Sequence, residues 1–361
     1  MSDWNIDIER CPDDQRQPIP TDGSKLGFGR LFTDHLFEAR FHRDRGWGEA
    51  TIRPRSSSVG LDPAAMCLHY GLEVFEGLKA YRAEGDSIHL FRWRKNAERM
   101  QRSAERLVME PVPVDLFGEG VRALVELEKD WVPSAEGCSL YIRPTLVASD
   151  PFLGVRPADE FLFYVLCSPV GAYYASGFKP TRILVEEEDI RAAEGGLGEA
   201  KTGANYAASL RAQRRAQAAG YTQVLWLDAK EHRYIEEVGT SNIFFKIDGK
   251  VVTPPLGGTI LPGVTRDSVL RMLKHWDIPV AEERITIDDV LAAADAGTLE
   301  EAFGTGTAAV ISPVGVLGYR GRDVDVADGS VGELSQRLYD ALTGIQYQRD
   351  PDHFEWCDRV C

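Results

Sequence analysis

Residues 198–210 read GEAKTGANYAASL and place Lys201 in a glycine-rich loop, directly ahead of an alanine-rich helix. Three glycines lie within the six residues that precede this lysine, and Gly203 follows it. A lysine in such a loop is most often a solvated surface charge, because lysine is rarely buried. The role of Lys201 therefore depends on which other chemical groups the chain brings to it.

Length and charge restrict the class of protein. With 361 residues, the chain exceeds one ordinary domain and favours two. Its formal net charge of -15 argues against binding nucleic acid or an anionic membrane through overall charge, although a local basic pocket remains possible. No long apolar run is present, and the N-terminal residues lack the features of a signal or transit peptide. We expect a cytoplasmic protein that binds neither nucleic acid nor a membrane.

The cysteine pattern indicates no metal and no redox chemistry. The six cysteines are Cys11, Cys67, Cys138, Cys167, Cys357 and Cys361. None belongs to a C-x-x-C unit, so neither a zinc site nor a redox pair is indicated, and reduced structural thiols are expected. Cys357 and Cys361 lie in the last residues of the chain, where fraying is expected.

The N-terminal half mixes helices and strands. Apolar spacing predicts helices over about 94–108 and 115–130. Aromatic and β-branched residues predict strands at 139–149 and 160–171. Glycine and proline then interrupt the pattern at 173–180, which we interpret as an interdomain linker.

The C-terminal half also mixes both element types. Strand-like runs are TRILVEE (181–187), QVLWLD (223–228), RYIEEVGTSNIFFKI (233–247), KVVTPP (250–255) and AAVISPVGVLGY (308–319). The pair Asp248–Gly249 predicts a hairpin. Because no regular βαβ rhythm appears, we expect an α+β fold of two domains, a smaller one at 1–172 and a larger one at 181–361.

Two loops are suited to an anion. In LPGVTR, a helix follows Pro262 and Gly263, with Thr265 as a candidate N-cap, and the backbone N–H groups of a helix start attract phosphate. An ordinary capped helix explains the same pattern. In FGTGT (303–307), two glycines are expected to form a nest of backbone N–H groups, with the Thr307 hydroxyl beside it. The chain has neither a Walker loop nor a G-x-G-x-x-G fingerprint, so a nucleotide phosphate chain held in the usual ways is not expected, and a single phosphate monoester stays open.

Charged side chains within regular elements leave their roles open. Arg99 lies in a stripe of arginines beside the apolar face of its helix, where a solvated position and a pocket position are both possible. Glu236 and Glu237 are consecutive in a strand and face opposite sides, so one is expected to be solvated and the other to need a partner. The pattern does not distinguish between them.

The motifs taken together are specific. In chain order they are HYGLEVFEGLKAY (69–81), RMQRSA (99–104), YIRPT (141–145), VGAYY (170–174), KTGANY (201–206), EVGTSN (237–242), LPGVTR (261–266) and FGTGTA (303–308). This set resembles the branched-chain amino-acid aminotransferases, pyridoxal 5'-phosphate enzymes of fold type IV. The resemblance runs from about Phe28 to Tyr347.

The resemblance implies a site for pyridoxal 5'-phosphate. Lys201 would form the Schiff base with the cofactor aldehyde and act as the catalytic proton carrier. Tyr206 would contact the ring hydroxyl, and Glu237, rather than Glu236, would hold the ring nitrogen protonated. The phosphate would be held by Arg99, Val264, Thr265 and Thr307.

For substrates, the resemblance implies leucine, isoleucine and valine, with 2-oxoglutarate as the amino acceptor. The carboxylate would bind at Thr240 and Ala308, and Arg143 would accept the second carboxylate of glutamate. The aromatic pocket would comprise Phe28, Tyr70, Phe75, Tyr141 and Tyr173. A homodimer is implied, because Tyr70 would complete the site of the partner subunit.

Two departures from the family pattern are visible. Some relatives carry a C-x-x-C pair where this chain has Ala309 and Ser312, so that thiol switch is expected to be absent. Thr265 stands where many relatives have valine. The alternatives are a D-amino-acid aminotransferase or an aminodeoxychorismate lyase on the same fold, a lysine-dependent aldolase, or a non-enzymatic phosphate- or cofactor-binding protein. The first two would be expected to lack the motifs at 69–81 and 141–145, the aldolase lacks its barrel rhythm here, and a carrier does not need Lys201.

Overall fold

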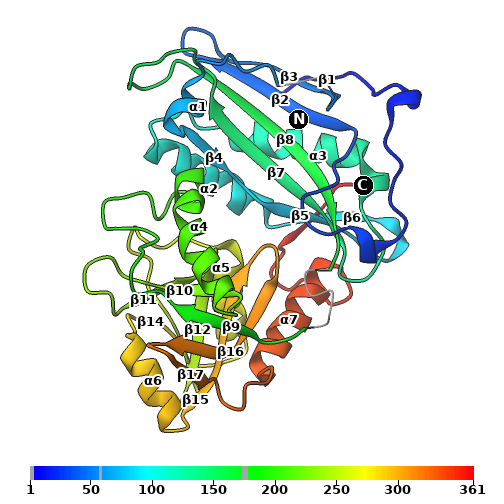
Figure 1. Ribbon diagram of the computed structural model, residues 1–361. Coiled ribbons are helices and arrows are strands. Elements are labelled where there is room, and N and C mark those ends of the chain that lie inside the picture. The colour runs from blue at the N-terminus through cyan, green and yellow to red at the C-terminus, as the bar shows by residue number, and fades with distance from the viewer. Residues whose placement is uncertain (1–3, 57–58, 173–177) are drawn as a thin grey trace. The chain divides into compact units, whose positions relative to one another are not determined.

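The computed structural model describes residues 4–56, 59–172 and 178–361, and the chain divides into two compact units. Unit 1 comprises Met1–Ala175, Ala200–Gly203 and Gly344–Cys361, and unit 2 comprises Ser176–Glu199 and Ala204–Thr343. Each unit contains one mixed sheet with helices packed on it (Figure 1). The α+β class predicted from the sequence is therefore confirmed.

Unit 1 is built on one sheet. Its strands are β1 (Ile6–Ile8), β2 (His35–His42), β3 (Gly46–Pro54), β4 (Glu73–Phe75), β5 (Leu78–Arg82), β6 (Ile88–Phe91), β7 (Ser139–Ala148), β8 (Glu160–Val170) and β18 (Cys357–Arg359). Within the described residues the order is β1-β3-β2-β8-β7-β5-β6-β18, and β4 pairs with β7. The long strands β7 and β8 pair antiparallel over their whole length, so they form the centre of the sheet.

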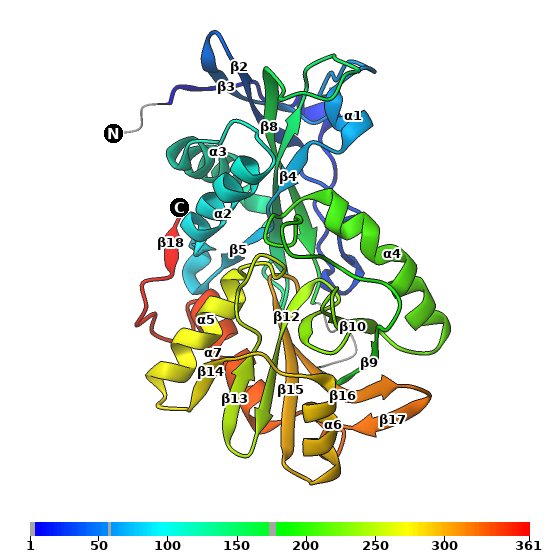
Figure 2. The ribbon, with the colours of Figure 1, turned by 90° about the vertical axis from the view of Figure 1, so that its left-hand side faces the viewer.

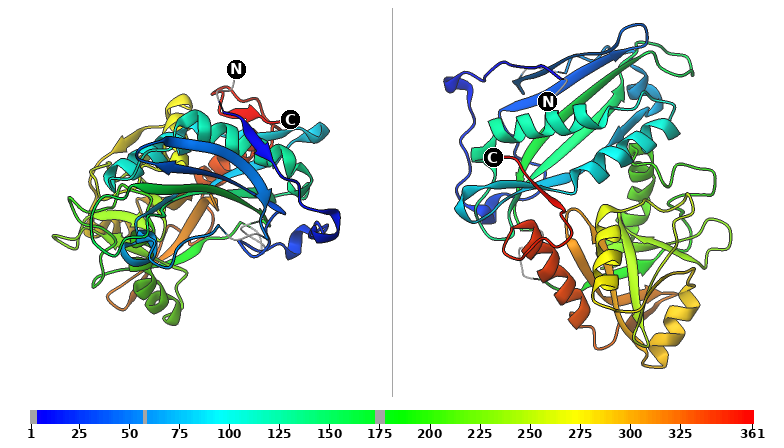
Figure 3. Two further views of the ribbon diagram at one scale, coloured as in Figure 1. Left: turned by 90° about the horizontal axis from the view of Figure 1, so that it is seen from above. Right: turned by 180° about the vertical axis from the view of Figure 1, so that it is seen from behind.

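The helices of unit 1 are α1 (Met66–Tyr70), α2 (Trp93–Arg106) and α3 (Val114–Leu127). The helices α2 and α3 cover one face of this sheet (Figure 3). The ring of Phe117 on α3 stacks on Phe163 of β8 with 6.0 Å between the centroids. Both rings are fully buried, and burying such a side chain contributes about 1.5–3 kcal/mol.

Unit 2 contains a sheet that closes on itself. Its strands are β9 (Thr181–Val185), β10 (Gln223–Leu227), β11 (Ile235–Val238), β12 (Ser241–Ile247), β13 (Lys250–Thr253), β14 (Val280–Glu282), β15 (Leu299–Gly306), β16 (Val310–Tyr319) and β17 (Arg322–Asp325). The order is β11-β10-β9-β16-β15-β12-β13-β14, with β17 on β16. Because β11 also pairs with β12, the strands from β11 to β12 form a closed ring around an apolar core.

The helices of unit 2 lie around this ring. They are α4 (Gly203–Ala218), α5 (Val264–His275), α6 (Ile287–Asp295) and α7 (Glu333–Gln346). Helix α6 starts with a capping box in which Thr286 and Asp289 satisfy each other's backbone N–H groups. It packs beside β15 and β17 (Figure 2). The predicted site residues Glu237, Thr240 and Thr307 lie in β11, in the turn that follows it and in the turn that follows β15.

A turn divides the strand run predicted at 233–247. Gly239 adopts a φ of 55°, a left-handed conformation that glycine reaches without strain, and the chain reverses there between β11 and β12. The predicted hairpin at Asp248–Gly249 is confirmed, with both residues at positive φ. The predicted helices at 94–108 and 115–130 correspond to α2 and α3.

The end of the chain differs from the prediction. Cys357 begins β18, which pairs antiparallel with β6, so the tail is not frayed. These backbone hydrogen bonds place Gly344–Cys361 in unit 1, although we predicted one domain over 181–361. The division after Ala175 falls within the predicted linker at 173–180, of which residues 173–177 lie outside the described part.

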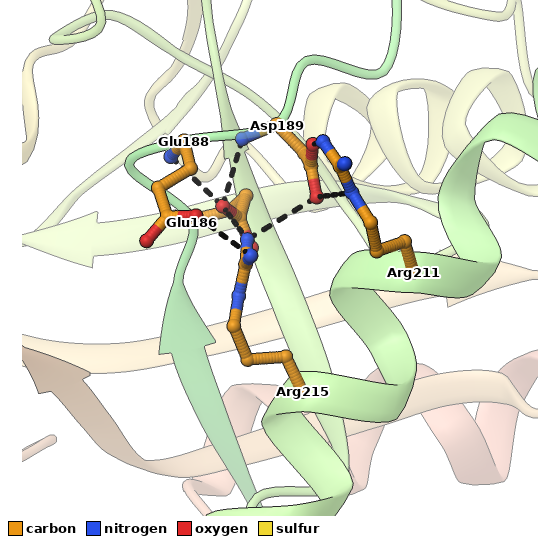
Figure 4. Close-up of polar contacts among 5 residues, drawn as sticks. All are labelled: Glu186, Glu188, Asp189, Arg211 and Arg215. Carbon is orange, nitrogen blue, oxygen red and sulfur yellow. Dashed lines mark hydrogen bonds and ion pairs between the residues drawn. The ribbon is translucent and has the colours of Figure 1, made fainter.

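A network of charged side chains joins α4 to the segment after β9 (Figure 4). Arg215 contacts Glu186 at 2.5 Å, Glu188 at 2.8 Å and Asp189 at 3.2 Å, and Arg211 pairs with Asp189. Burial alone would raise the pKa of Glu186, but Arg215 and two backbone N–H groups hold it below its usual value. The arginines of these pairs are partly or largely exposed, and such ion pairs contribute little energy singly, so the network mainly fixes the path of this loop on α4.

Two further properties concern the whole described chain. Among residues 4–56, 59–172 and 178–361, no helix has both the length and the apolar character needed to span a bilayer. All six cysteines are unpaired thiols, as expected from their spacing.

Candidate active site

The predicted site residues are divided between the two units. Unit 1 contains Phe28, Tyr70, Phe75, Arg99, Tyr141, Arg143 and Lys201. Unit 2 contains Tyr206, Glu237, Thr240, Val264, Thr265, Thr307 and Ala308. Tyr173 lies outside the described residues. Lys201 thus packs with the elements of the N-terminal half, although it follows the linker by more than twenty residues.

The backbone of Lys201 is held from two sides within unit 1. Its N–H donates to the Ser103 hydroxyl at 2.9 Å, and its carbonyl accepts from the Phe75 N–H at 3.0 Å. The side-chain amine lies 4.6 Å from the centre of the Phe75 ring, within the range of a cation–π contact. The half-buried lysine is therefore positioned between β4 and α2, which makes it more than a solvated surface charge.

Arg99 is buried and paired with a carboxylate that the sequence reasoning did not assign. Its Nε and Nη2 atoms donate to the two oxygens of Glu76, each at 2.7 Å, and Asn96 donates to Glu76 at 2.8 Å. Burial alone would raise the pKa of Glu76, but Arg99, Lys201 and Asn96 hold it below its ordinary value. The carboxylate engages one edge of the guanidinium and fixes its orientation.

Aromatic rings and one guanidinium gather beside Lys201. Phe28 meets Tyr141 edge to face with 5.0 Å between centroids, and Arg143 donates to the Tyr141 hydroxyl at 2.8 Å. The Arg143 guanidinium lies 4.8 Å from the centre of the Phe75 ring. A Cβ atom at position 77 would overlap the Tyr141 hydroxyl, so only Gly77 fits there. These contacts bring together four of the predicted substrate residues of unit 1, namely Phe28, Phe75, Tyr141 and Arg143.

Tyr70 lies on the surface of unit 1. It is 39% exposed at the end of α1, and its hydroxyl donates to the carbonyl of Leu153. The loop that holds Leu153 exposes further large apolar side chains, among them Phe152 and Val155. Tyr70 therefore belongs to an exposed apolar surface.

In unit 2, Glu237 is the buried carboxylate of β11. Its Oε2 contacts Arg191 Nε at 2.6 Å, and its Oε1 accepts from the Leu261 N–H at 2.8 Å and from Asn242 at 3.1 Å. These donors stabilise a negative charge on a side chain that is 2% exposed. Glu236 is also buried, so the expectation that one of the two glutamates is solvated is wrong.

Helix α5 begins next to Glu237 through the loop that contains Leu261. The N-cap is Gly263, not Thr265 as predicted, because Thr265 is already helical and buried in the first turn. Gly263 offers no side-chain oxygen to the first backbone N–H groups. Asn242 also donates to the Leu261 carbonyl at 2.9 Å, which fixes this helix start beside β12.

The turns at Thr240 and Thr307 lie at the same end of the sheet. Asn242 pairs with Thr305 in the β12–β15 ladder, which brings the residues that follow Gly306 beside Ser241. Thr307 and Ala308 form the turn between β15 and β16 and are half-buried. The predicted nest is wrong, because Gly304 and Gly306 are extended residues of β15 that pair with β16.

Tyr206 is half-buried in the first turns of α4. Its neighbour Asn205 donates to the Leu197 carbonyl at 2.8 Å, which ties the helix to the glycine-rich loop before it. The ion-pair network of Figure 4 holds the middle of the same helix. The contact at Leu197 and the ion pairs at Glu186 therefore hold the helix that carries Tyr206.

Sequence reasoning missed the partners of the charged site residues. Glu76, Asn242 and Ser103 all lie within motifs that we quoted, without an assigned role. Arg191 lies in none of these motifs. One physical rule could have pointed to these partners. A buried arginine or glutamate requires an opposite charge nearby, so placing Arg99 or Glu237 in a pocket implies a counter-ion for each. In the described residues, no group of three or more metal-ligating side chains is close enough to hold an ion.

Comparisons with known proteins identify the family and the fold. Residues 73–316 match the family described as Amino-transferase class IV, and the chain belongs to this family. It is 50% identical to the branched-chain-amino-acid aminotransferase 2 of Bacillus subtilis (strain 168), over all of this chain and 98% of that protein.

Solved structures of the same kind share the fold. The T.th. branched-chain amino acid aminotransferase with pyridoxamine 5'-phosphate superposes with a TM-score of 0.75 at 28% identity, covering 90% of this chain and 98% of that one. Its complex with N-(5'-phosphopyridoxyl)-L-glutamate gives a TM-score of 0.73 at 28% identity and the same coverage. The other class IV activities and the non-enzymatic alternatives are not favoured.

Proposed function

We propose that this protein is a pyridoxal-phosphate-dependent aminotransferase that exchanges the amino group between leucine, isoleucine or valine and 2-oxoglutarate, reversibly. The observation that carries the proposal is the shared position of two cationic groups. Lys201 and Arg143 lie 4.6 and 4.8 Å from the centre of the same Phe75 ring. A primary amine and a guanidinium suited to a carboxylate therefore lie beside the same aromatic ring. The 50% sequence identity to a branched-chain-amino-acid aminotransferase supports the substrate class.

The residues present fit the cofactor. Glu237 offers a buried carboxylate suited to a protonated ring nitrogen, and Arg191 keeps that carboxylate in position. Helix α5 starts at Val264 without a side-chain cap, which suits a phosphate held by Val264 and Thr265, with Thr307 and Arg99 as further ligands. Tyr206 would contact the ring hydroxyl. Bound pyridoxal phosphate supplies a carbonyl carbon that condenses with amines and a ring that withdraws electrons from them.

The chain's own groups then supply binding and proton transfer. The Lys201 amine would hold the cofactor and carry the proton removed from the substrate Cα. Thr240 and the backbone at Ala308 would bind the α-carboxylate. Arg143 would bind the second carboxylate of glutamate with its planar fork, and L-glutamate is part of the complex solved for the T.th. relative.

The apolar wall determines the side chain that is accepted. Phe28 packs edge to face on Tyr141, and Arg143 links Tyr141 to Phe75, so these three rings would form the apolar wall for a branched aliphatic group. One methylene in such a pocket changes the transition-state energy by about 1–3 kcal/mol, so leucine, isoleucine and valine are all expected as substrates.

We also propose that two copies of the chain form a homodimer, in which Tyr70 borders the partner's site. The apolar side chains Leu68, Tyr70, Phe152, Leu153 and Val155 are exposed on unit 1 and support a surface that a second copy covers. Sedimentation measures this property, and a monomer at micromolar concentration contradicts it.

The free cysteines support a cytoplasmic location, since such thiols are typical of reducing compartments.

The absorption spectrum tests the function directly. Enzyme with bound pyridoxal phosphate should be yellow, lose its visible band on addition of leucine and regain it with 2-oxoglutarate. Lys201→Ala should lower leucine transamination by more than about a thousandfold, because the proton carrier and the anchoring amine are both lost.

The matched control is Lys274→Ala, an exposed lysine of α5 that should leave the rate unchanged. Borohydride treatment should attach the cofactor to Lys201 in the wild type. A colourless protein in the presence of pyridoxal phosphate, or turnover by Lys201→Ala near the wild-type rate, contradicts the proposal.

A further inference from the structure

Unit 2 contains a cavity of about 480 Å³ that none of the predicted site residues lines. It is bordered by β11, by the loop that precedes α5 and by the segment after β10. This volume lies in the range of small-molecule pockets, which is about 300–1,000 Å³. The cavity is therefore large enough for a metabolite-sized ligand.

Glu236 is the buried carboxyl group of this cavity. Consecutive residues of a strand face opposite sides, so Glu236 points away from the contacts that Glu237 makes. Its side chain is nine-tenths buried, and within the described residues its Oε2 atom has no hydrogen-bond partner. The Thr259 side chain forms a hydrogen bond with the carboxyl group, which leaves Oε2 unsatisfied. A buried acceptor that lacks a donor is costly, which indicates a missing donor.

The neighbouring cation does not supply that donor. Arg191 lies near Glu236, but its Nε contacts Glu237 at 2.6 Å and its Nη1 donates to the Thr259 carbonyl at 2.7 Å. Arg284, which also borders the cavity, stacks on the Tyr234 ring with its guanidinium carbon 3.5 Å from the centroid. Both arginines are thus engaged elsewhere.

The lining favours a cationic ligand with an aliphatic part. Four acidic side chains, those of Glu194, Asp228, Glu231 and Glu236, border the cavity, against two basic ones, those of Lys230 and Arg284. Asp228 is satisfied by backbone N–H groups, so Glu236 is the buried acceptor that remains. Pro254, Pro255 and Ile260 add an apolar wall.

We propose that this cavity binds a small aliphatic primary amine, whose ammonium group donates a hydrogen bond to Oε2 of Glu236 while its carbon chain lies against the proline wall. The ammonium group is common to simple amines and to α-amino acids. In an amino acid, the added carboxylate would face Lys230 or Arg284.

The test compares isobutylamine with L-valine, which differs from it by one carboxylate. The enzyme is loaded with pyridoxamine 5'-phosphate, because this form cannot condense with an added amine. Calorimetric titration and a soaked crystal should show isobutylamine at Glu236. Glu236→Gln should weaken binding by about tenfold or more, as expected for a hydrogen bond to a charged group. Tighter binding of isobutylamine than of L-valine at this position identifies a simple amine as the ligand, and the reverse identifies an amino acid.

Two variants make the result decisive. Glu231→Gln removes the same charge from an exposed part of the lining and should weaken binding by less than about threefold. Ala193→Leu keeps Glu236 and fills the cavity, so it should abolish binding even if Glu236→Gln folds poorly. Density for water alone at Glu236, or an equal loss in Glu231→Gln and Glu236→Gln, overturns the proposal. The spectral test of Lys201 is independent of either outcome.

Discussion

Two buried arginine–glutamate pairs, one in each unit, have the same chemistry and opposite arrangements. In unit 1, Glu76 is fully buried and engages two nitrogens of Arg99. In unit 2, Arg191 contacts one oxygen of Glu237 through Nε, and its other nitrogens donate hydrogen bonds to the carbonyls of Thr259 and Gly198. Thus in unit 1 the carboxylate orients the arginine, and in unit 2 the arginine orients the carboxylate.

The difference explains why a buried ion pair suits a binding site. Removing two charges from water costs several kcal/mol per ion, and the attraction within the pair offsets this only when the geometry is good. A pair is therefore weak evidence for stability. Each pair here instead orients one charged group, a cation suited to phosphate in unit 1 and an anion suited to a ring N–H in unit 2.

The largest expected effect comes from removing either arginine. Arg99→Ala and Arg191→Ala should each lower the free energy of unfolding of the cofactor-free protein by about 3–5 kcal/mol, because each leaves a buried carboxylate without its counter-ion. Urea denaturation measures the loss. Added pyridoxal phosphate should restore more stability to Arg191→Ala, which retains the proposed phosphate ligand, than to Arg99→Ala.

Exposed arginines in the same units are the controls for this comparison. Arg102→Ala on α2 and Arg214→Ala on α4 should change the free energy of unfolding by no more than about 0.5 kcal/mol. Equal losses of unfolding free energy in the buried and exposed variants would mean that the buried carboxylates do not depend on Arg99 and Arg191 as counter-ions. Equal rescue by the cofactor would remove the distinction between them.

A smaller effect separates the two carboxylates by function. Glu237→Gln should retain bound cofactor and lower kcat for leucine by about a hundredfold, because the ring nitrogen loses its charged partner. Glu76→Gln should mainly weaken cofactor binding, since it loosens Arg99. Kinetics at saturating pyridoxal phosphate, with cofactor affinity measured separately, test this contrast. An unchanged kcat in Glu237→Gln counts against its proposed role.

The smallest effect is a pH dependence of stability. The pKa of Glu76 is held below its ordinary value of 4.5 despite burial, mainly by Arg99. Its contribution is therefore present above pH 4.5 and is lost as the pH falls through the folded-state pKa. The difference in melting temperature between wild type and Glu76→Gln should shrink as the pH is lowered from about 7 to 3. A difference that widens in acid would show that the pair does not favour the ionised form.

Local patterns predicted most of the elements. The apolar spacing of α2 and α3 and the turn residues at Asp248–Gly249 act within a few neighbours along the chain, so they are visible in the sequence. The errors have a tertiary origin. Gly304 and Gly306 are read as a loop, whereas pairing with β12 and β16 draws them into a strand.

The site was predicted unevenly for the same reason. Motifs selected Lys201, Arg99 and Glu237 as candidate site residues, because each lies in a distinctive run of residues. No local pattern indicates that Glu76 meets Arg99, or that Arg191 meets Glu237, since these contacts depend on packing between segments far apart in sequence. The burial of Glu236 is likewise absent from the alternation of its strand.

The pairing of β18 with β6 has a consequence for the order of synthesis. Unit 1 contains strands from before and after unit 2 in the sequence, because Cys357–Arg359 covers the edge strand Ile88–Phe91. Until residues 357–359 have been made, the outer edge of β6 has no partner within its own sheet. An uncovered strand edge can pair with another chain, so this edge is exposed to misassembly throughout translation of unit 2. The unit that starts first is completed last.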